Sequence, residues 1–178
     1  MPELDDSNHR YADAIAAWGA SLSRLARGYE ADPDRRGDLL QEIHIALWRS
    51  FAAFDGRCSL RTWVYRIAHN VAASHIVRNR RAAARLVDLE TLETEPGFFD
   101  AEAQADRKHS AARLLDLIRK LAPVDRQTIL LYLEGERAES IAEVTGLSAV
   151  NVATKIHRIK KLLGRQFQEG EPHAGRRS

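Results

Sequence analysis

Hydrophobic residues recur every three or four positions along most of this chain, which is the spacing of one face of an α-helix. No segment shows the strict alternation that is typical of a half-buried strand. The first predicted helix has one apolar stripe, formed by Ile15, Trp18, Leu22, Leu25 and Tyr29. The sequence Asp32-Pro33-Asp34 ends that helix. In a second helix we expect Leu40, Ile43, Leu47 and Phe51 inside, and Asp38, Gln41, Glu42 and Arg49 outside.

A loop at residues 54–58 separates the second helix from a long third one, which Ser59 is placed to cap. Its predicted inner face consists of Leu60, Val64, Ile67 and Val71. A second stripe contains Trp63, Arg66, Asn70 and Val77, and His69, Ser74 and Arg78 lie near it.

Helical periodicity returns between residues 101 and 121, and a short helix is predicted from Pro123 to near Gly135. The next segment predicts a helix-turn-helix. A helix at residues 140–144 meets Gly146, which suits a left-handed turn, and Ser148 then caps a longer helix. The inward residues of that helix are Val152, Ile156, Ile159 and Leu163, and the outward ones are Asn151, Thr154, Arg158, Lys161 and Arg165.

These elements predict an all-α fold with two small helical domains joined by an acidic linker, the second domain being a helix-turn-helix. The predicted domains are residues 8–86 and 108–167, with the linker at 87–107 and a disordered tail at 168–178. The longest apolar run is far too short to span a bilayer, and the acidic N-terminus has no apolar signal sequence. The single cysteine, Cys58, fits a reducing compartment. We therefore expect a soluble cytoplasmic protein without membrane insertion.

Charge is strongly segregated along the chain. Residues 56–87 contain seven arginines, no lysine and no acidic residue, and Trp63 and Tyr65 lie among them. Residues 88–106 contain seven acidic residues and no basic one. A basic segment that carries aromatic side chains can neutralise phosphates and stack on bases. This pattern indicates nucleic-acid binding by the first segment and a different role for the second.

The predicted second helix of the helix-turn-helix also suits DNA. Residues 144–168 contain five basic residues and no acid. Polar side chains near the start of such a helix reach base edges in the major groove, while later basic residues contact phosphates.

Two separate blocks of the sequence resemble the extracytoplasmic-function group of bacterial RNA polymerase sigma factors. The first comprises Asp38-Leu39-Leu40-Gln41-Glu42, Leu47-Trp48-Arg49 and residues 62–70, and is similar to the second region of that family. The other runs from residue 121 through Ser140-Ile141-Ala142-Glu143 and Gly146-Leu147-Ser148 to Arg158, and is similar to the fourth region. Together the blocks cover about two thirds of the chain, in the order that the family has.

The resemblance implies a promoter-specificity subunit that binds core RNA polymerase, melts the minus-ten promoter element and reads the minus-thirty-five element as duplex. Residues implied in polymerase binding are Asp38, Gln41, Glu42 and Trp48. Those implied in binding the melted minus-ten strand are Arg57, Arg61, Trp63, Arg66, His69, Asn70 and Arg78. Those implied in reading the minus-thirty-five element are Ser148, Asn151, Thr154, Lys155, Arg158 and Lys161. His69, Ser74, Asn151 and Ala153 depart from the usual residues, so no promoter sequence can be carried over.

One alternative is a free-standing helix-turn-helix regulator of duplex DNA, which explains residues 139–165 equally well but leaves the first block unexplained. A DNA-processing enzyme would need carboxylates or a nucleophile, and the basic segment offers no carboxylate. No histidine pair has ligand spacing, and no phosphate-binding loop is visible. The sequence therefore predicts a protein that is not an enzyme and has no metal or cofactor. It leaves open the inducing stimulus, an anti-sigma partner and a redox role for Cys58.

Overall fold

The computed structural model describes residues 2–86 and 104–169, and every regular element in these two ranges is a helix. The first part contains α1 (Pro2–Tyr29), α2 (Pro33–Ser50), the short 3₁₀-helix η1 (Phe51–Ala53) and α3 (Leu60–Leu86). The second part contains α4 (Gln104–Arg119), α5 (Pro123–Leu133), α6 (Ala138–Thr145) and α7 (Ala149–Glu169). The all-helical prediction is confirmed. The predicted acidic linker lies outside the described residues up to residue 103, and so does the predicted tail from residue 170.

The helix ends follow the capping signals of the sequence. The Asp32 carboxylate accepts a hydrogen bond from the Arg35 N–H at 2.9 Å, and Pro33 occupies the first turn of α2, where no N–H partner is needed. The Ser59 hydroxyl accepts from the Thr62 N–H at 3.0 Å, as predicted for the start of α3.

In the first domain α1, α2 and α3 pack against one another around a leucine-rich core. Of the two adjacent leucines at the start of α2, Leu39 is fully buried, whereas Leu40, which we predicted to be inside, is only partly buried. In α3 the fully buried positions include Val64, Ala68 and Ala72, while Ile67 and Val71 pack at the edge of the core. The inner face of α3 is therefore turned by about one residue from the predicted one.

The second domain is built around the inward residues of its four helices. Its fully or nearly fully buried side chains include Ile118, Leu131, Ile141, Val152, Ile159 and Leu163. Gly146 joins α6 to α7 with φ +76°, a left-handed conformation that favours glycine, which confirms the predicted turn.

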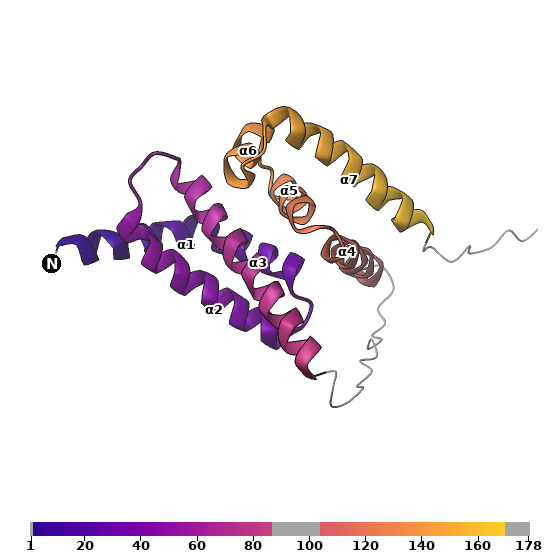
Figure 1. Ribbon diagram of the computed structural model, residues 1–178, viewed down its shortest axis with the longest axis horizontal. Coiled ribbons are helices and arrows are strands. Elements are labelled where there is room, and N and C mark those ends of the chain that lie inside the picture. The colour runs from indigo at the N-terminus through magenta and orange to yellow at the C-terminus, as the bar shows by residue number, and fades with distance from the viewer. Residues whose placement is uncertain (1, 87–103, 170–178) are drawn as a thin grey trace, which may run out of the picture.

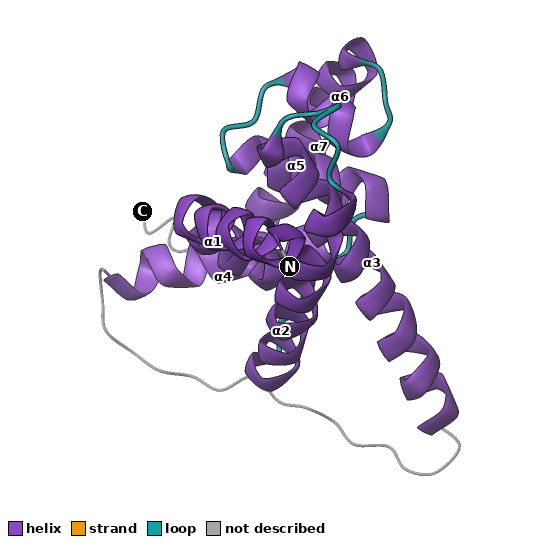
Figure 2. Ribbon diagram, turned by 90° about the vertical axis from the view of Figure 1, so that its left-hand side faces the viewer, coloured by secondary structure: helices purple, strands orange, loops and turns teal. Residues whose placement is uncertain are grey.

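The two domains lie side by side. α3 packs against α6, and α1 packs against α4 and α5, while α7 lies on the side of the second domain that faces away from the first (Figure 1). Figure 2, turned by 90°, shows α5, α6 and α7 together above the first three helices.

Candidate nucleic-acid interface

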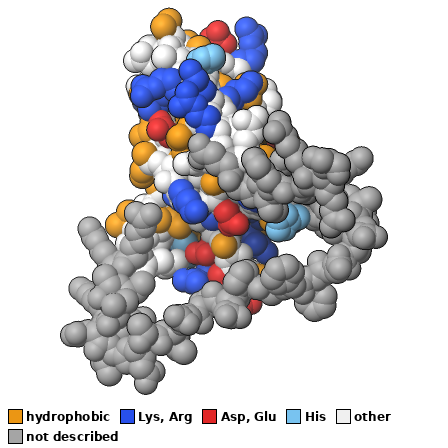
Figure 3. All heavy atoms as spheres, turned by 90° about the vertical axis from the view of Figure 1, so that its right-hand side faces the viewer, with side chains coloured by type: hydrophobic (Ala, Val, Ile, Leu, Met, Phe, Trp, Pro, Cys, Tyr) orange, Lys and Arg blue, Asp and Glu red, His pale blue; other side chains and the backbone are white. Residues whose placement is uncertain are grey.

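The outer face of α7 presents a polar and basic surface. Asn151, Thr154, Arg158 and Lys161 are all exposed on it, as their spacing predicted. Figure 3 shows Lys and Arg side chains gathered in the upper part of the molecule, which the second domain forms. The outer face of α7 is therefore an exposed polar and basic surface.

The start of α7 is fixed by local hydrogen bonds. The Ser148 hydroxyl accepts from the Asn151 N–H at 3.3 Å, and the Thr154 hydroxyl donates to the Val150 carbonyl at 3.0 Å. Ser148 thus acts as the cap of the helix. Lys155 is half-buried and its ammonium forms an ion pair with the Asp125 carboxylate of α5, so in this structure it ties α7 to the rest of the domain.

In the first domain the loop before α3 is ordered by Asp55 and Trp63. The Arg57 N–H and guanidinium both donate to the Asp55 carboxylate, which lowers the pKa of that carboxyl, and the Arg57 side chain is 88% exposed. The half-buried Trp63 donates its indole N–H to the Ser50 hydroxyl at 2.9 Å and meets the Phe54 ring edge-on at 5.4 Å. Trp63 therefore supports this loop in the present conformation.

His69 lies inside the protein, in contrast to its prediction as a DNA contact. Its side chain is 2% exposed, and its Nδ1 atom lies 2.9 Å from the Tyr29 hydroxyl. Burial lowers the pKa of His69 to about 3, so the imidazole is neutral at physiological pH. Its neighbour Asn70 is exposed.

Three residues near the start of α3 contact the second domain. The Arg61 guanidinium pairs with the buried carboxylate of Glu136, which lies between α5 and α6. The Thr62 hydroxyl donates to the Glu143 carboxylate of α6 at 2.9 Å, and Arg66 donates to the Glu143 backbone carbonyl at 2.7 Å. The second domain therefore occupies part of the predicted surface for the minus-ten element.

A polar cleft remains between these contacts. It has a volume of about 1050 Å³ and is lined from one side by residues 55–59, Trp63 and Arg66, and from the other by Ser140 and Glu143. This pairing could not be predicted from the sequence, because Glu136 and Glu143 are far from α3 along the chain.

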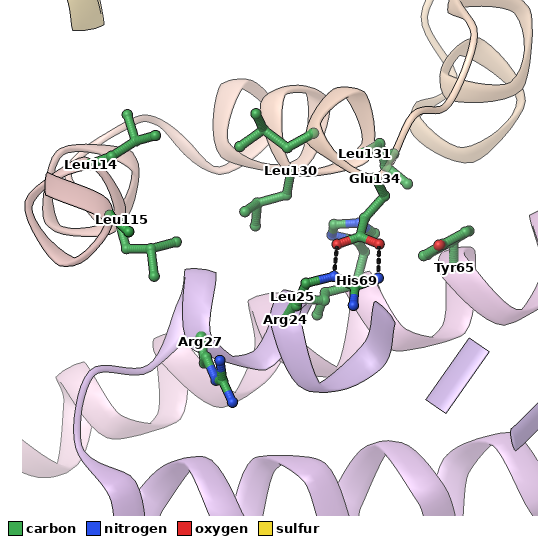
Figure 4. Close-up of a pocket in the computed structure, with 12 residues that line it drawn as sticks. Arg24, Leu25, Arg27, Tyr65, His69, Leu114, Leu115, Leu130, Leu131 and Glu134 are labelled. Atoms are coloured by element: carbon green, nitrogen blue, oxygen red, sulfur yellow. Dashed lines mark hydrogen bonds and ion pairs between the residues drawn. The ribbon is translucent and has the colours of Figure 1, made fainter. Parts of the chain in front are cut away.

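A second set of interdomain contacts surrounds Glu134 at the end of α5. Arg24 of α1 donates two hydrogen bonds to the Glu134 carboxylate, at 2.8 and 2.7 Å (Figure 4). Burial opposes ionisation of Glu134, but the hydrogen bonds from Arg24 and Ser21 and the charge of Arg24 outweigh it, so its pKa is lowered. An apolar cavity of about 280 Å³ lies beside this pair, between leucines of α1, α4 and α5.

The predicted polymerase-binding residues lie on α2. Asp38 and Gln41 are exposed, and Trp48 is 42% exposed with its indole N–H donating to the Asn8 side chain at 2.8 Å. Glu42 is half-buried between two residues of α3. Its carboxylate pairs with Arg78 and lies 3.4 Å from Nδ1 of the buried His75.

In the described residues, no group of three or more His, Cys, Asp or Glu side chains could hold a metal ion. Cys58 is a partly exposed free thiol. Among the helices of residues 2–86 and 104–169, none combines the length and the apolar character that a membrane span requires.

Two family models match the chain, in the order of the two domains. The model of sigma-70 region 2 matches residues 14–82, and the model of sigma-70 region 4 matches residues 111–163. The first match covers the part of the chain that a free-standing helix-turn-helix regulator leaves unexplained.

Among similar proteins, the RNA polymerase sigma-H factor of Pseudomonas aeruginosa is 31% identical over 146 residues, which are 77% of this chain and 75% of that protein. The ECF RNA polymerase sigma factor SigX of Bacillus subtilis is 24% identical over 142 residues, or 77% of this chain and 73% of SigX. Two other curated relatives are longer, and the chain spans 38% and 43% of their length.

The fold also resembles a solved structure, that of the sigma factor RpoE of Bartonella quintana in complex with the anti-sigma factor NepR. The TM-score is 0.66 at 16% identity, over 91% of this chain and 98% of that one. This likeness establishes the fold.

Proposed function

Because the chain belongs to the extracytoplasmic-function family of RNA polymerase sigma factors, which direct promoter recognition by the polymerase, we propose a division of labour between its two domains. The first domain (residues 8–86) docks on core polymerase and binds the melted minus-ten strand. The second domain (residues 108–167) reads the minus-thirty-five element as duplex. The protein works in the cytoplasm and needs no cofactor.

Recognition of the upstream element is assigned to the exposed face of α7, and this exposed face is the observation that carries the proposal. Ser148, Asn151 and Thr154 lie at the start of the helix, where a major-groove helix meets base edges. Arg158 and Lys161 lie further along and contact phosphates. Lys155 joins them when its ion pair with Asp125 exchanges for a phosphate.

Binding of the minus-ten strand is assigned to Arg57, Arg61, Trp63, Arg66, Asn70 and Arg78. His69 is left out of this surface because it is buried. Since Arg61 and Arg66 contact the second domain in this structure, the two domains must separate before these side chains can reach DNA. The described arrangement is therefore a closed form, and core polymerase binds the open one.

Docking on polymerase is assigned to the α2 face that carries Asp38, Gln41, Glu42 and Trp48. The exposed Asp38 and Gln41 near the start of α2 and the exposed indole of Trp48 near its end can form a polar interface with an aromatic anchor. An anti-sigma partner is part of the proposal, because RpoE of Bartonella quintana, which has the same fold, was solved in complex with one.

The test is transcription of sheared genomic DNA by bacterial core polymerase with and without the protein, followed by sequencing of the RNA 5′ ends. We expect new start sites that share a two-part upstream motif. Arg158→Ala should weaken initiation at these sites, whereas Lys120→Ala, an exposed change outside α7, should not. The proposal fails if no new starts appear while the protein binds duplex DNA tightly by itself.

A further inference from the structure

Val150 is the most exposed large hydrophobic side chain in the described part of the chain, at 76% of its full surface. It lies in the first turn of α7, two residues after the Ser148 cap. An exposed valine contributes no burial free energy to folding, and its branched side chain is a weaker helix former than alanine. Neither packing nor helix stability therefore accounts for it.

The helical register places Val150 on the face of α7 that is turned away from the domain. Val152, Ile159 and Leu163 are buried and define the inward direction. At 100° per residue, Val150 lies almost opposite them, on the same side as Thr154 and Lys161. It is thus an apolar side chain within the polar and basic surface assigned to the upstream element.

The neighbouring Thr154 strengthens this apolar spot. Its hydroxyl donates to the Val150 carbonyl at 3.0 Å, so its hydrogen is already used within the helix. The branched side chains of Val150 and Thr154 follow each other by four residues and share one face of the helix.

In the major groove, the C5-methyl group of thymine is the one apolar feature of the base edges. The first residues of the second helix of a helix-turn-helix are those that meet base edges. We propose that Val150 is a specificity-determining residue that contacts the methyl group of one thymine in the upstream promoter element. This inference rests on the proposed function of α7.

An interface with another protein fits this position less well. Asn151, Arg158 and Lys161 are polar or basic, and the buried centres of protein interfaces are depleted in charge. A lone valine among such residues lacks the contiguous apolar area that a docking site needs. The polar and basic neighbours of Val150 suit the phosphates that line a DNA groove, and the valine itself suits a single methyl group inside that groove.

The experiment uses core polymerase, the full chain and a promoter mapped as above. Each thymine of the upstream element is replaced in turn by deoxyuridine, which removes only the methyl group. Run-off transcription is measured at limiting holoenzyme concentration for the wild type, Val150→Ala, Val150→Thr and Val124→Ala. Val124 is an exposed valine outside α7 and serves as the matched control.

We expect run-off transcription by the wild type to fall about fourfold when one particular thymine is replaced by deoxyuridine. This factor corresponds to the burial of one methyl group. Val150→Ala should show a similar loss on the thymine template and no further loss at that position. Val150→Thr, which keeps one methyl group, should retain part of the discrimination, and Val124→Ala should behave as the wild type.

Three results would overturn the inference about Val150. Transcription by the wild type could be unaffected by every deoxyuridine, or Val150→Ala could be as sensitive to deoxyuridine as the wild type. The third result is that Val150→Ala lowers transcription by the same factor on all templates. The last result indicates a contact with protein. A different result, initiation that does not depend on the upstream element at all, would overturn the proposed function of α7 itself.

Discussion

The Tyr29 hydroxyl and the His69 Nδ1 atom form a buried hydrogen bond of 2.9 Å that joins the end of α1 to α3. The Arg126 guanidinium of α5 lies over the Tyr29 ring, 5.4 Å from its centre, so this pair also borders the second domain. Burial raises the pKa of Tyr29 and lowers that of His69, and both groups are therefore neutral at pH 7.

The lowered pKa of His69 makes stability depend on pH. The unfolded chain takes up a proton on this imidazole near pH 6.5, whereas the folded protein does so only near pH 3. The contribution of His69 is fully present above pH 6.5 and is lost as the pH falls toward 3. Between pH 7 and 5 we expect up to about 2 kcal/mol less stability from this group.

Denaturant unfolding of wild type and His69→Phe at several pH values between 5 and 7 measures this contribution. The slope of stability against pH should be smaller in His69→Phe. Tyr29→Phe is the control. It loses the hydrogen bond but keeps the buried imidazole, so its slope of stability against pH should equal that of the wild type. Equal slopes in wild type and His69→Phe would show that His69 is accessible to protons in the folded state.

Gly28 of α1 lies directly against Leu130 of α5, in the contact between the two domains. A Cβ atom at this position would lie 2.5 Å from Cδ2 of Leu130 in α5. Alanine stabilises a helix by about 1 kcal/mol relative to glycine. We therefore expect Gly28→Ala to keep or raise the stability of the first domain while it pushes the domains apart.

The distance between the domains can be measured by pulsed electron paramagnetic resonance. The spin labels are attached to cysteines introduced as Ala52→Cys and Gln168→Cys, in a Cys58→Ser background. Both labelled sites are exposed. Gly19→Ala lies on the same helix, and its Cβ would meet only Ile15 of that helix, at 3.4 Å. It should leave the distance unchanged. An unchanged distance in Gly28→Ala would mean that Leu130 moves aside and the interface tolerates the extra methyl group.

Arg24 is expected to favour the closed form through its two hydrogen bonds with Glu134. Without Arg24 the largely buried Glu134 carboxylate loses its charged partner, which costs about 1.5–3 kcal/mol in a buried site. Because Arg24 itself is 55% exposed, solvent reduces this cost. We expect Arg24→Ala to raise the open-to-closed ratio roughly tenfold, a change of about 1.4 kcal/mol.

The same pair of spin labels measures this increase in the open form, which gives a second and longer distance between the labels. Arg27→Ala is the matched control, since Arg27 accepts the hydrogen bonds of Arg119 with its backbone carbonyl, which the substitution leaves in place. Added salt should move the wild type in the same direction as Arg24→Ala. If Arg27→Ala opens the protein as much, the charge of α1 as a whole is responsible rather than the Arg24–Glu134 pair.

The ion pair between Lys155 and Asp125 should stabilise the second domain modestly. Both side chains are about one-third exposed, and pairs of this kind contribute about 0.5–1 kcal/mol. A double-mutant cycle with Lys155→Gln and Asp125→Asn, followed by thermal unfolding, should give a coupling of that size. Lys161→Gln with Asp125→Asn should give none. Absence of coupling in the first cycle would leave Lys155 with a role in DNA binding alone.

Features that depend on one helix and its ends could be predicted from the sequence. The Ser59 cap, the left-handed Gly146 and the inward face of α7 each follow from residues a few positions apart, where spacing and capping chemistry decide the structure. Even so, periodicity could not decide between Leu39 and Leu40. Adjacent helix positions are 100° apart, and the packing of α1 and α3 determines which of the two is buried.

The rest could not be predicted, because it depends on partners far away in the sequence. The family resemblance implied that His69 contacts DNA, but His69 is buried and its Nδ1 atom forms a hydrogen bond with the Tyr29 hydroxyl. Arg61 and Arg66 looked like free DNA contacts, and only the folded chain brings Glu136 and Glu143 to them.

The hydrogen bond from Arg66 to the backbone carbonyl of Glu143 does not depend on the side chain at position 143.

A molecule that must open before it binds has an apparent affinity equal to its intrinsic affinity multiplied by the open fraction. If one molecule in a hundred is open, the free protein binds promoter DNA about a hundredfold more weakly than its surface allows. In the proposed scheme the polymerase removes this penalty by holding the domains apart, and the free protein binds promoter DNA only weakly until then.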